Sequence, residues 1–183
     1  MSKRNYVVIA RFDDTTTQKL HDLRLQLRKK GIIDKPSEWP PHITIAAYEG
    51  VDIESLLQWT EDFTGRHAAF GIMLSALGVF PPRGKLSKTA VLYAAPSQSK
   101  ELVDFYYAFH ERLDEFCGDL GWLYSAKHGH PVMHSTIGSC GIRKLNKTAK
   151  MILSRQIFGN AKFTALEVYT YPMELIRRFD LVS

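Results

Sequence analysis

A histidine and a threonine stand two residues apart at two places in the chain, at residues 42–45 (His-Ile-Thr-Ile) and 134–137 (His-Ser-Thr-Ile). In a β-strand, residues i and i+2 point to the same face, about 6.6 Å apart along the strand. Each tetrapeptide would therefore hold an imidazole beside a hydroxyl. Two such strands facing each other would form a pocket with two groups that titrate near neutrality and two hydroxyl donors, which suits a small anion such as phosphate.

The context of the two tetrapeptides is also repeated. Each follows a proline-bearing segment, at residues 39–41 and 130–133, and each precedes a glycine and a helix-like stretch. Proline is tolerated where a strand begins, because no ladder donor is needed there. The repeat therefore extends beyond the four residues to the segments on either side of them.

Alternating and helical hydrophobic patterns predict the elements that must position these side chains. Asp13 and Asp14 indicate the start of a first helix, and Lys29, Lys30 and Gly31 indicate its end. Ser97 is predicted to cap the third helix. The predicted strands are 6–12, 42–48, 70–80, 89–95, 132–138, 163–171 and 174–181, and the predicted helices are about 15–30, 52–65, 98–117 and 144–158. This mixture predicts an α+β fold with two small sheets packed by outer helices.

Bulk composition is that of one compact globular domain of 183 residues, with 45% hydrophobic and 23% charged residues. Cys117 and Cys140 are too few for a disulfide framework, so we expect a reducing, cytoplasmic location. No apolar run approaches about 20 residues, and residues 1–5 lack the apolar region of a signal peptide. The net charge of +5 is compatible with a polyanionic partner, although a solvated basic surface would have the same composition.

Taken together, the paired His-x-Thr-hydrophobic tetrapeptides, one per half of a chain of this length, resemble the two-histidine (2H) phosphoesterase superfamily. Its bacterial branch is named for 2′-5′ RNA ligase and includes RNA 2′,3′-cyclic phosphodiesterases. The resemblance covers nearly the whole chain in element order, and its specific part is the two tetrapeptides. Relatives often carry an arginine shortly after the second tetrapeptide, where this chain has Ser139 and Cys140 and the first arginine is Arg143.

The resemblance implies a bilobal fold with pseudo-twofold symmetry, in which two antiparallel sheets face a central cleft and helices lie outside. Residues 1–183 would form a single two-lobed domain with one His-x-Thr strand per lobe. His42 and His134 would be catalytic, Thr44 and Thr136 would bind phosphate, and no metal or cofactor would be needed. The expected substrates are RNA ends or nucleotides with a 2′,3′-cyclic phosphate or a 2′-5′ linkage, and we expect a monomer that contacts no membrane.

Opening a cyclic phosphate needs two proton transfers, since the attacking water loses a proton and the departing ribose oxygen gains one. One neutral imidazole and one imidazolium on opposite sides of phosphorus provide both, and the threonine hydroxyls can donate to the non-bridging oxygens. Following the resemblance, we take His134 as the base on water and His42 as the acid toward the leaving oxygen. The roles would reverse for ligation.

Other side chains are candidates for substrate contacts. Basic groups lie on the tip of the predicted hairpin and after the second tetrapeptide. Aromatic groups on strands could stack a base, although strand aromatics more often pack in a core. The candidate contacts are Tyr48, Arg83, Lys85, His130 and Arg143, with Lys88, Lys144 and Lys147 as further cations and Phe12 and Tyr93 as further aromatics.

Three alternatives stay open at the level of sequence. His128, His130 and His134 have a spacing that could ligate zinc, although no carboxylate or second cysteine completes the set locally. The chain could instead hydrolyse a small cyclic phosphate of the ADP-ribose type, in which case neutralising Arg83 and Lys85 should do no harm. It could also be a non-catalytic RNA- or nucleotide-binding module, but such a module has no need of two proton-transfer groups.

Overall fold

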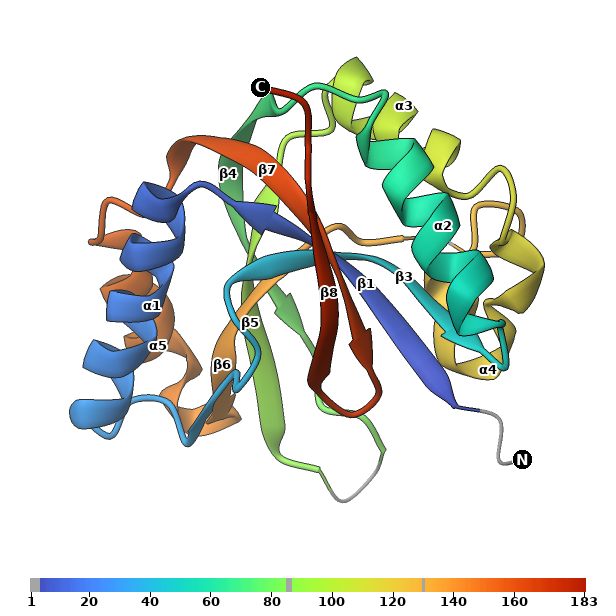
Figure 1. The fold of residues 1–183 in the computed structure, drawn as a ribbon. Helices are drawn as coiled ribbons and strands as arrows, with labels where there is room; N and C mark the ends of the chain where they lie inside the picture. The colour runs from blue at the N-terminus through green and yellow to red at the C-terminus, as the bar shows by residue number, and fades with distance from the viewer. Residues whose placement is uncertain (1–3, 85–86, 130) are drawn as a thin grey trace.

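The fold is a mixed α+β arrangement of antiparallel strands with helices packed outside them (Figure 1). The computed structural model describes residues 4–84, 87–129 and 131–183. The strands are β1 (Asn5–Phe12), β2 (Lys35–Pro36), β3 (His42–Glu49), β4 (Phe70–Phe80), β5 (Thr89–Pro96), β6 (Ser135–Gly141), β7 (Gly159–Thr170) and β8 (Glu174–Asp180). The helices are α1 (Asp14–Lys29), α2 (Ile53–Thr64), α3 (Lys100–Phe109), α4 (Gly118–Gly121) and α5 (Leu145–Leu153), with short 3₁₀ turns η1 (Asp114–Phe116), η2 (Trp122–Tyr124) and η3 (Ile142–Lys144).

The predicted α+β class with antiparallel strands is confirmed, but the two predicted sheets are joined into one. The strand order is β2-β6-β5-β4-β7-β1-β3, and β8 also pairs with β7. Strand β4 joins the halves because its residues 70–74 pair with β7, whereas residues 74–80 pair with β5 after a register shift. The first tetrapeptide thus lies on β3 in one half of the sheet, and the second lies at β6 in the other half.

Helix α1 connects the two halves of the sheet, since it follows β1 in one half and packs against β6 in the other. Its N-terminus is capped by Asp13, whose carboxylate accepts the Thr16 N–H at 2.9 Å. Leu20, Leu23 and Leu27 form its buried stripe. Figure 1 shows α1 and α5 together on one side of the molecule, with α2 and α3 on the other.

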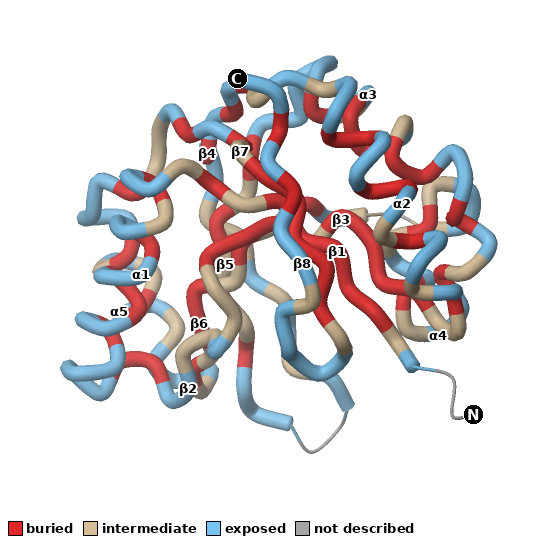
Figure 2. The backbone as a smooth tube through the Cα atoms, viewed as in Figure 1, coloured by how far each residue is buried: buried red, intermediate tan, exposed pale blue. Residues whose placement is uncertain are grey.

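The core lies between the sheet and the helices, and Figure 2 shows buried backbone concentrated in the central strands. Strand side chains such as Val8, Ile43 and Phe163 are fully buried, and they share one apolar cluster with residues from α1, α2 and α3. A smaller apolar cluster lies on the opposite face of the sheet. Its members are Val7, Ile9, Ala47 and Tyr169. Among the described residues, no helix is both long and apolar enough to cross a membrane.

Two predicted helices are shorter in the structure. The predicted helix over 98–117 is α3, which is capped by Ser99 instead of Ser97 and ends at Phe109. The chain turns there because the His110 side chain is held by other groups, with Nε2 3.0 Å from the Ile45 carbonyl oxygen and Nδ1 2.9 Å from Asp114. Similarly, α5 ends at Leu153, and β7 begins at Gly159 rather than at 163.

The second predicted histidine strand begins three residues late. Strand β6 starts at Ser135, so His134 directly precedes it instead of lying within it. Ser135 pairs with Ala94, and β5 ends two residues later at Pro96, which has no N–H to continue the ladder. Strand β2 was not predicted, because its two residues are strand-like only through pairing with β6.

Candidate active site

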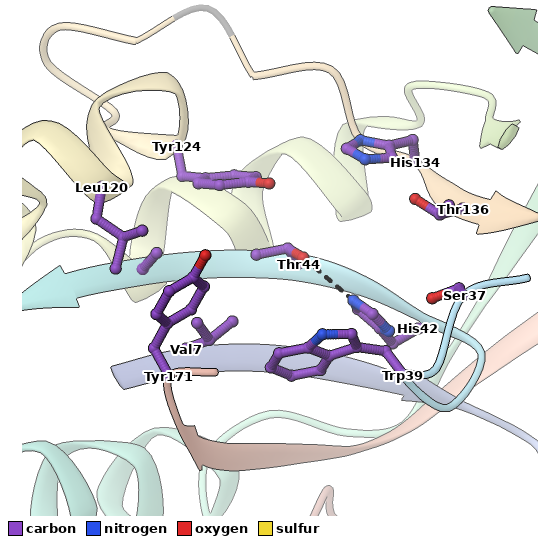
Figure 3. A pocket seen from close by; sticks show the side chains of 11 residues that line it. Val7, Ser37, Trp39, His42, Thr44, Leu120, Tyr124, His134, Thr136 and Tyr171 are labelled. Carbon is purple, nitrogen blue, oxygen red and sulfur yellow. Dashed lines mark hydrogen bonds between the residues drawn. The ribbon is translucent and has the colours of Figure 1, made fainter. Parts of the chain in front are cut away.

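Both tetrapeptides reach a single cavity of about 270 Å³ (Figure 3). His42 and Thr44 reach the cavity from β3, and His134 and Thr136 reach it from the start of β6. The structure therefore brings together all four side chains that the sequence singled out. The other lining residues are Val7, Ser37, Trp39, Ala47, Leu120, Tyr124 and Tyr171.

The two imidazoles are oriented in the same way. His42 Nδ1 donates to the Pro40 carbonyl oxygen at 2.6 Å, and His134 Nδ1 donates to the Val132 carbonyl oxygen at 2.5 Å. In both cases the acceptor lies two residues before the histidine. Because a carbonyl can only accept, the proton of the neutral ring is held on Nδ1 and Nε2 is left for chemistry. Thr44 Oγ1 lies 3.2 Å from His42 Nε2 and can donate to it (Figure 3).

Each tetrapeptide also ends in a β-bulge. Val8 pairs with Ala46 and Ile9 with Thr44, so Ile45 is the extra residue in β3. In β6, Gly138 pairs with Leu92 and Thr136 with Tyr93, so Ile137 is the extra residue there. Bulges of this kind re-aim neighbouring side chains and are common beside active sites. The duplication in sequence is thus a duplication of local backbone geometry.

A buried polar side chain holds the backbone at each bulge. His110 Nε2 donates to the Ile45 carbonyl oxygen at 3.0 Å. Arg24, only 4% exposed, reaches from α1 to the Thr136 carbonyl oxygen and also donates to the Trp39 carbonyl oxygen at 2.6 Å. One guanidinium therefore ties the segment before His42 to the strand that carries Thr136.

Electrostatics hold both histidines in the neutral form in the free protein. Burial lowers the pKa of His42 to about 4, and the nearby positive charge of Arg24 acts in the same direction. Burial also lowers the pKa of His134, against the opposing effect of its hydrogen bond to Val132. At neutral pH both Nε2 atoms therefore carry a lone pair.

Aromatic side chains surround the four polar groups. Trp39 packs between His42 and Tyr169, with ring centroids 5.5 and 5.1 Å away. The His134 ring packs against Phe80 and Tyr93, with centroid separations of 4.8 and 5.2 Å. These contacts fix the rotamers of both imidazoles. Figure 3 shows Tyr124, Tyr171 and Leu120 grouped at the end of the cavity away from Thr136.

Tyr48 does not reach the cavity. It shares strand parity with His42 and Thr44 in the sequence, but the bulge at Ile45 shifts the alternation by one residue. Ala47 therefore lines the cavity, and Tyr48 is fully buried in the core. The predicted contact at Tyr48 is wrong for this reason. Phe12 is likewise 2% exposed and belongs to the core.

The predicted basic contacts have different positions. Arg83 lies at the exposed turn after β4, and its positive charge lowers the pKa of Tyr124, which burial raises. Arg83 is not among the residues that line the cavity. Arg143 is exposed in η3 and does not line the cavity. Lys85 and His130 lie outside the described residues.

Potential metal ligands gather in the described residues at one place, where His110, Asp114 and Cys117 are all buried. The Asp114 carboxylate already accepts from Ser125 Oγ at 2.7 Å and from the Ala126 N–H at 2.5 Å. Because His110 Nε2 also bonds to the Ile45 carbonyl oxygen, we interpret this group as a hydrogen-bonded support for β3. The zinc alternative depended on His130, which lies outside the described residues.

Sequence reasoning missed Arg24, His110, Trp39 and Tyr124. Arg24 had a readable signal, since it lies four residues after Leu20 on the apolar stripe of α1, where a charged side chain needs buried partners. His110 likewise follows the buried Tyr106 at helical spacing. Trp39 lies in a loop and Tyr124 ends the short 3₁₀ turn η2, and neither segment has a periodic signal in the sequence.

Comparison with known proteins gives a family match and fold matches. A family model described as the 2′-5′ RNA ligase superfamily matches residues 11–172. No curated protein gives a significant sequence match. At the identities found, the likeness to solved structures concerns the fold. The similar structures include apo LigT of E. coli (TM-score 0.57, 11% identity, 100% of both chains), TT0787 of Thermus thermophilus (0.60, 12%, 97% of both chains) and Usb1 of Kluyveromyces marxianus (0.56, 12%, 98% of this chain and 99% of that one). LigT has also been solved in complex with 3′-AMP.

Proposed function

Because the chain belongs to the 2′-5′ RNA ligase superfamily of two-histidine phosphoesterases, we propose that it opens 2′,3′-cyclic phosphates at RNA ends or on nucleotides. Membership supports a phosphoesterase or ligase type of activity. The observation that carries the finer proposal is the convergence of two equivalent His–Thr pairs on one cavity. The same geometry would serve a 2′-5′ linkage, because its phosphorus is also joined to two ester oxygens, one of which leaves during hydrolysis.

The four groups can divide the reaction without a metal ion. The threonine hydroxyls donate to the non-bridging oxygens, whose charge grows as water attacks. His134 Nε2 takes the proton of the water as its oxygen bonds to phosphorus. His42 Nε2 gives a proton to the ribose 3′-oxygen as its bond to phosphorus breaks, and the product is a 2′-phosphate. The bonds of both rings to backbone carbonyls keep each Nε2 aimed at the substrate.

His42 can act as an acid only if substrate binding raises its pKa enough to protonate the ring. Burial holds the pKa of His42 at about 4 in the free protein. A phosphate anion within hydrogen-bond distance favours the imidazolium and raises that pKa. Substrate binding near neutral pH is then coupled to the uptake of a proton, and the protonated ring is formed only where it is needed.

The aromatic end of the cavity supports a nucleoside as the group attached to the phosphate. Tyr124, Tyr171 and Trp39 line the cavity together with the apolar side chains of Val7 and Leu120. A base can stack on such rings without regard to its identity. The complex of LigT with 3′-AMP, a nucleoside phosphate, is in keeping with this assignment.

Product analysis tests the proposal directly. The wild-type protein, His42→Ala and His134→Ala are incubated with a nucleoside 2′,3′-cyclic phosphate, and His21→Ala, an exposed histidine on α1, serves as the matched control. We expect a 2′-phosphate product from the wild type and the control, and a loss of at least about 10²-fold in each active-site variant. Turnover that survives both active-site substitutions would exclude the two-histidine mechanism.

A further inference from the structure

The cavity between the histidines continues past Thr136 into a second cavity of about 310 Å³. Ser37, Trp39 and Thr136 line both cavities, so the two form one groove with the phosphate-binding threonine at the junction. The remaining residues of the second cavity are Lys35, Pro36, Glu38, Val91, Gly138 and Ser139.

The two ends of this groove differ in chemistry. Apart from the two His–Thr pairs and Ser37, the first cavity is lined by aromatic and apolar side chains. The second cavity is lined by the hydroxyl-bearing Ser37 and Ser139, by Lys35 and by its ion-pair partner Glu38. Within the described part of the chain, Lys35 is the one lysine or arginine that lines either cavity. The groove thus offers a place for a base at one end and a place for an anion at the other.

The backbone fixes the base of the Lys35 side chain beside the groove. Strand β2 consists of Lys35 and Pro36, and it pairs with β6 so that Lys35 lies opposite Ser139. The Lys35 ammonium group is 3.1 Å from Glu38, but both side chains are well exposed, at 71% and 64%. An exposed ion pair of this kind is weak, so the ammonium can exchange its carboxylate partner for a phosphate at little cost.

We propose that the second cavity binds the neighbouring phosphate of an oligonucleotide whose terminal phosphate lies between His42 and His134. The identity of the terminal group rests on the proposed function, whereas the second cavity adds the class of substrate, a chain of at least two nucleotides. Lys35 supplies the charge, and the Ser37 hydroxyl lines the same cavity as a donor to the phosphate oxygens. The Ser139 hydroxyl, which donates to the Lys35 carbonyl oxygen at 3.4 Å, would exchange that long bond for one to the phosphate. A contact of this kind adds affinity without selecting a base sequence.

Binding measurements test the proposal independently of turnover. A ribodinucleotide 3′-phosphate, which has one internal phosphate, is compared with a nucleoside 3′-phosphate over a series of salt concentrations. We expect the wild type to bind the dinucleotide more tightly. Lys35→Gln should lose about three- to fivefold of that preference and lower the slope of log Kd against log salt by about 0.7 for the dinucleotide alone.

Three further variants sharpen the measurement. Lys19→Gln, an exposed lysine of α1 that lines neither cavity, should behave as the wild type. Glu38→Gln should tighten dinucleotide binding because it removes the competing carboxylate. Ser139→Phe should fill the second cavity and weaken binding of the dinucleotide only.

The outcomes separate this proposal from the proposed function. Equal affinity of the wild type for both ligands, or equal losses in Lys35→Gln and Lys19→Gln, would overturn the second binding site. A dinucleotide preference that depends on Lys35, together with no turnover of a cyclic phosphate, would leave the binding site standing and remove the activity. Failure of the wild type to bind either ligand, in a protein that still hydrolyses a nucleoside 2′,3′-cyclic phosphate, would overturn the second binding site and leave the activity standing.

Discussion

Thr44 and Thr136 occupy matching positions, each two residues after a histidine and one residue before a bulged isoleucine. Thr44 lies within hydrogen-bond distance of His42 Nε2 in the free protein, so its hydroxyl must turn toward the phosphate when substrate binds. The two hydroxyls then donate to the non-bridging oxygens, whose negative charge grows in the transition state.

Replacing either hydroxyl should therefore slow the chemical step. We expect Thr44→Val and Thr136→Val each to lower kcat by about 10²-fold on a nucleoside 2′,3′-cyclic phosphate, because each removes one donor to the non-bridging oxygens while keeping the shape of the side chain. Thr15→Val, at an exposed position of α1, is the control. Unchanged kcat in both active-site variants would show that the hydroxyls do not touch the reacting phosphate.

At the residue scale, the sequence was informative where side-chain alternation is regular. The four polar residues were predicted from i, i+2 spacing, and the structure places all four around one cavity. Tyr48 was placed wrongly because the bulge at Ile45 reverses the alternation, and a bulge in β3 has no signal in a single sequence. Arg24 could have been noticed, since a charge on an apolar helix stripe demands an explanation.

At the element scale, α1 positions both tetrapeptides through Arg24. Its guanidinium donates to the Trp39 and Thr136 carbonyl oxygens, and its charge helps to keep the pKa of His42 low. Arg24 is thus a positioning residue that ties the two halves together, and its charge adds to the effect of burial on the pKa of one imidazole. His110 performs the corresponding backbone contact at the other bulge.

Arg24→Met separates these roles from simple packing. Two buried carbonyls lose their partner, so we expect the free energy of unfolding to fall by about 2–3 kcal/mol and turnover to drop. The pKa of His42, followed by NMR, should rise because a nearby positive charge is gone.

Two further variants complete this test. Arg24→Lys should restore the low pKa of His42 but not the turnover, since an ammonium cannot span two carbonyls as a guanidinium does. Arg28→Met, at an exposed position of the same helix, is the control. A folded Arg24→Met protein with wild-type turnover and an unchanged His42 pKa would refute the positioning role.

Most elements were predictable because their hydrophobic periods are strong, as for β1, α1 and β4. The ends of the helices and strands were harder to predict, because tertiary contacts determine them. Helix α3 stops where His110 bonds to β3, and β6 begins only where β5 offers a partner. Such limits depend on residues distant in sequence.

At the scale of the whole molecule, one continuous sheet carries both tetrapeptides, and β4 connects its halves. The separation into two sheets was predicted from strand order alone, which does not reveal that one strand pairs with both neighbours. The closure of the halves also buries His42, so folding removes an imidazole from water.

This burial links stability to pH. The pKa of His42 is about 4 in the folded protein and near 6.5 when unfolded, so the unfolded state binds the extra proton between those values. The contribution of the neutral ring is fully present above about pH 6.5 and is lost as the pH falls toward 4. We expect a loss of up to about 3 kcal/mol over this window by denaturant unfolding.

His42→Asn should flatten this dependence, because the titrating group is gone. Inorganic phosphate should protect the wild type at pH 5, since an anion bound in the cavity favours the imidazolium. Stability curves of the wild type and His42→Asn that run parallel between pH 6.5 and 4 would contradict the burial of an uncharged His42.

The convergence of both imidazoles on one anion is tested most directly by histidine NMR during a titration with inorganic phosphate at pH 6.5. We predict that the ring signals of His42 and His134 move together with one Kd and a stoichiometry of one, that both pKa values rise, and that His21 and His128 do not respond. Signals that saturate with different affinities, or a response of one ring alone, would contradict the claim that the two histidines share a single phosphate.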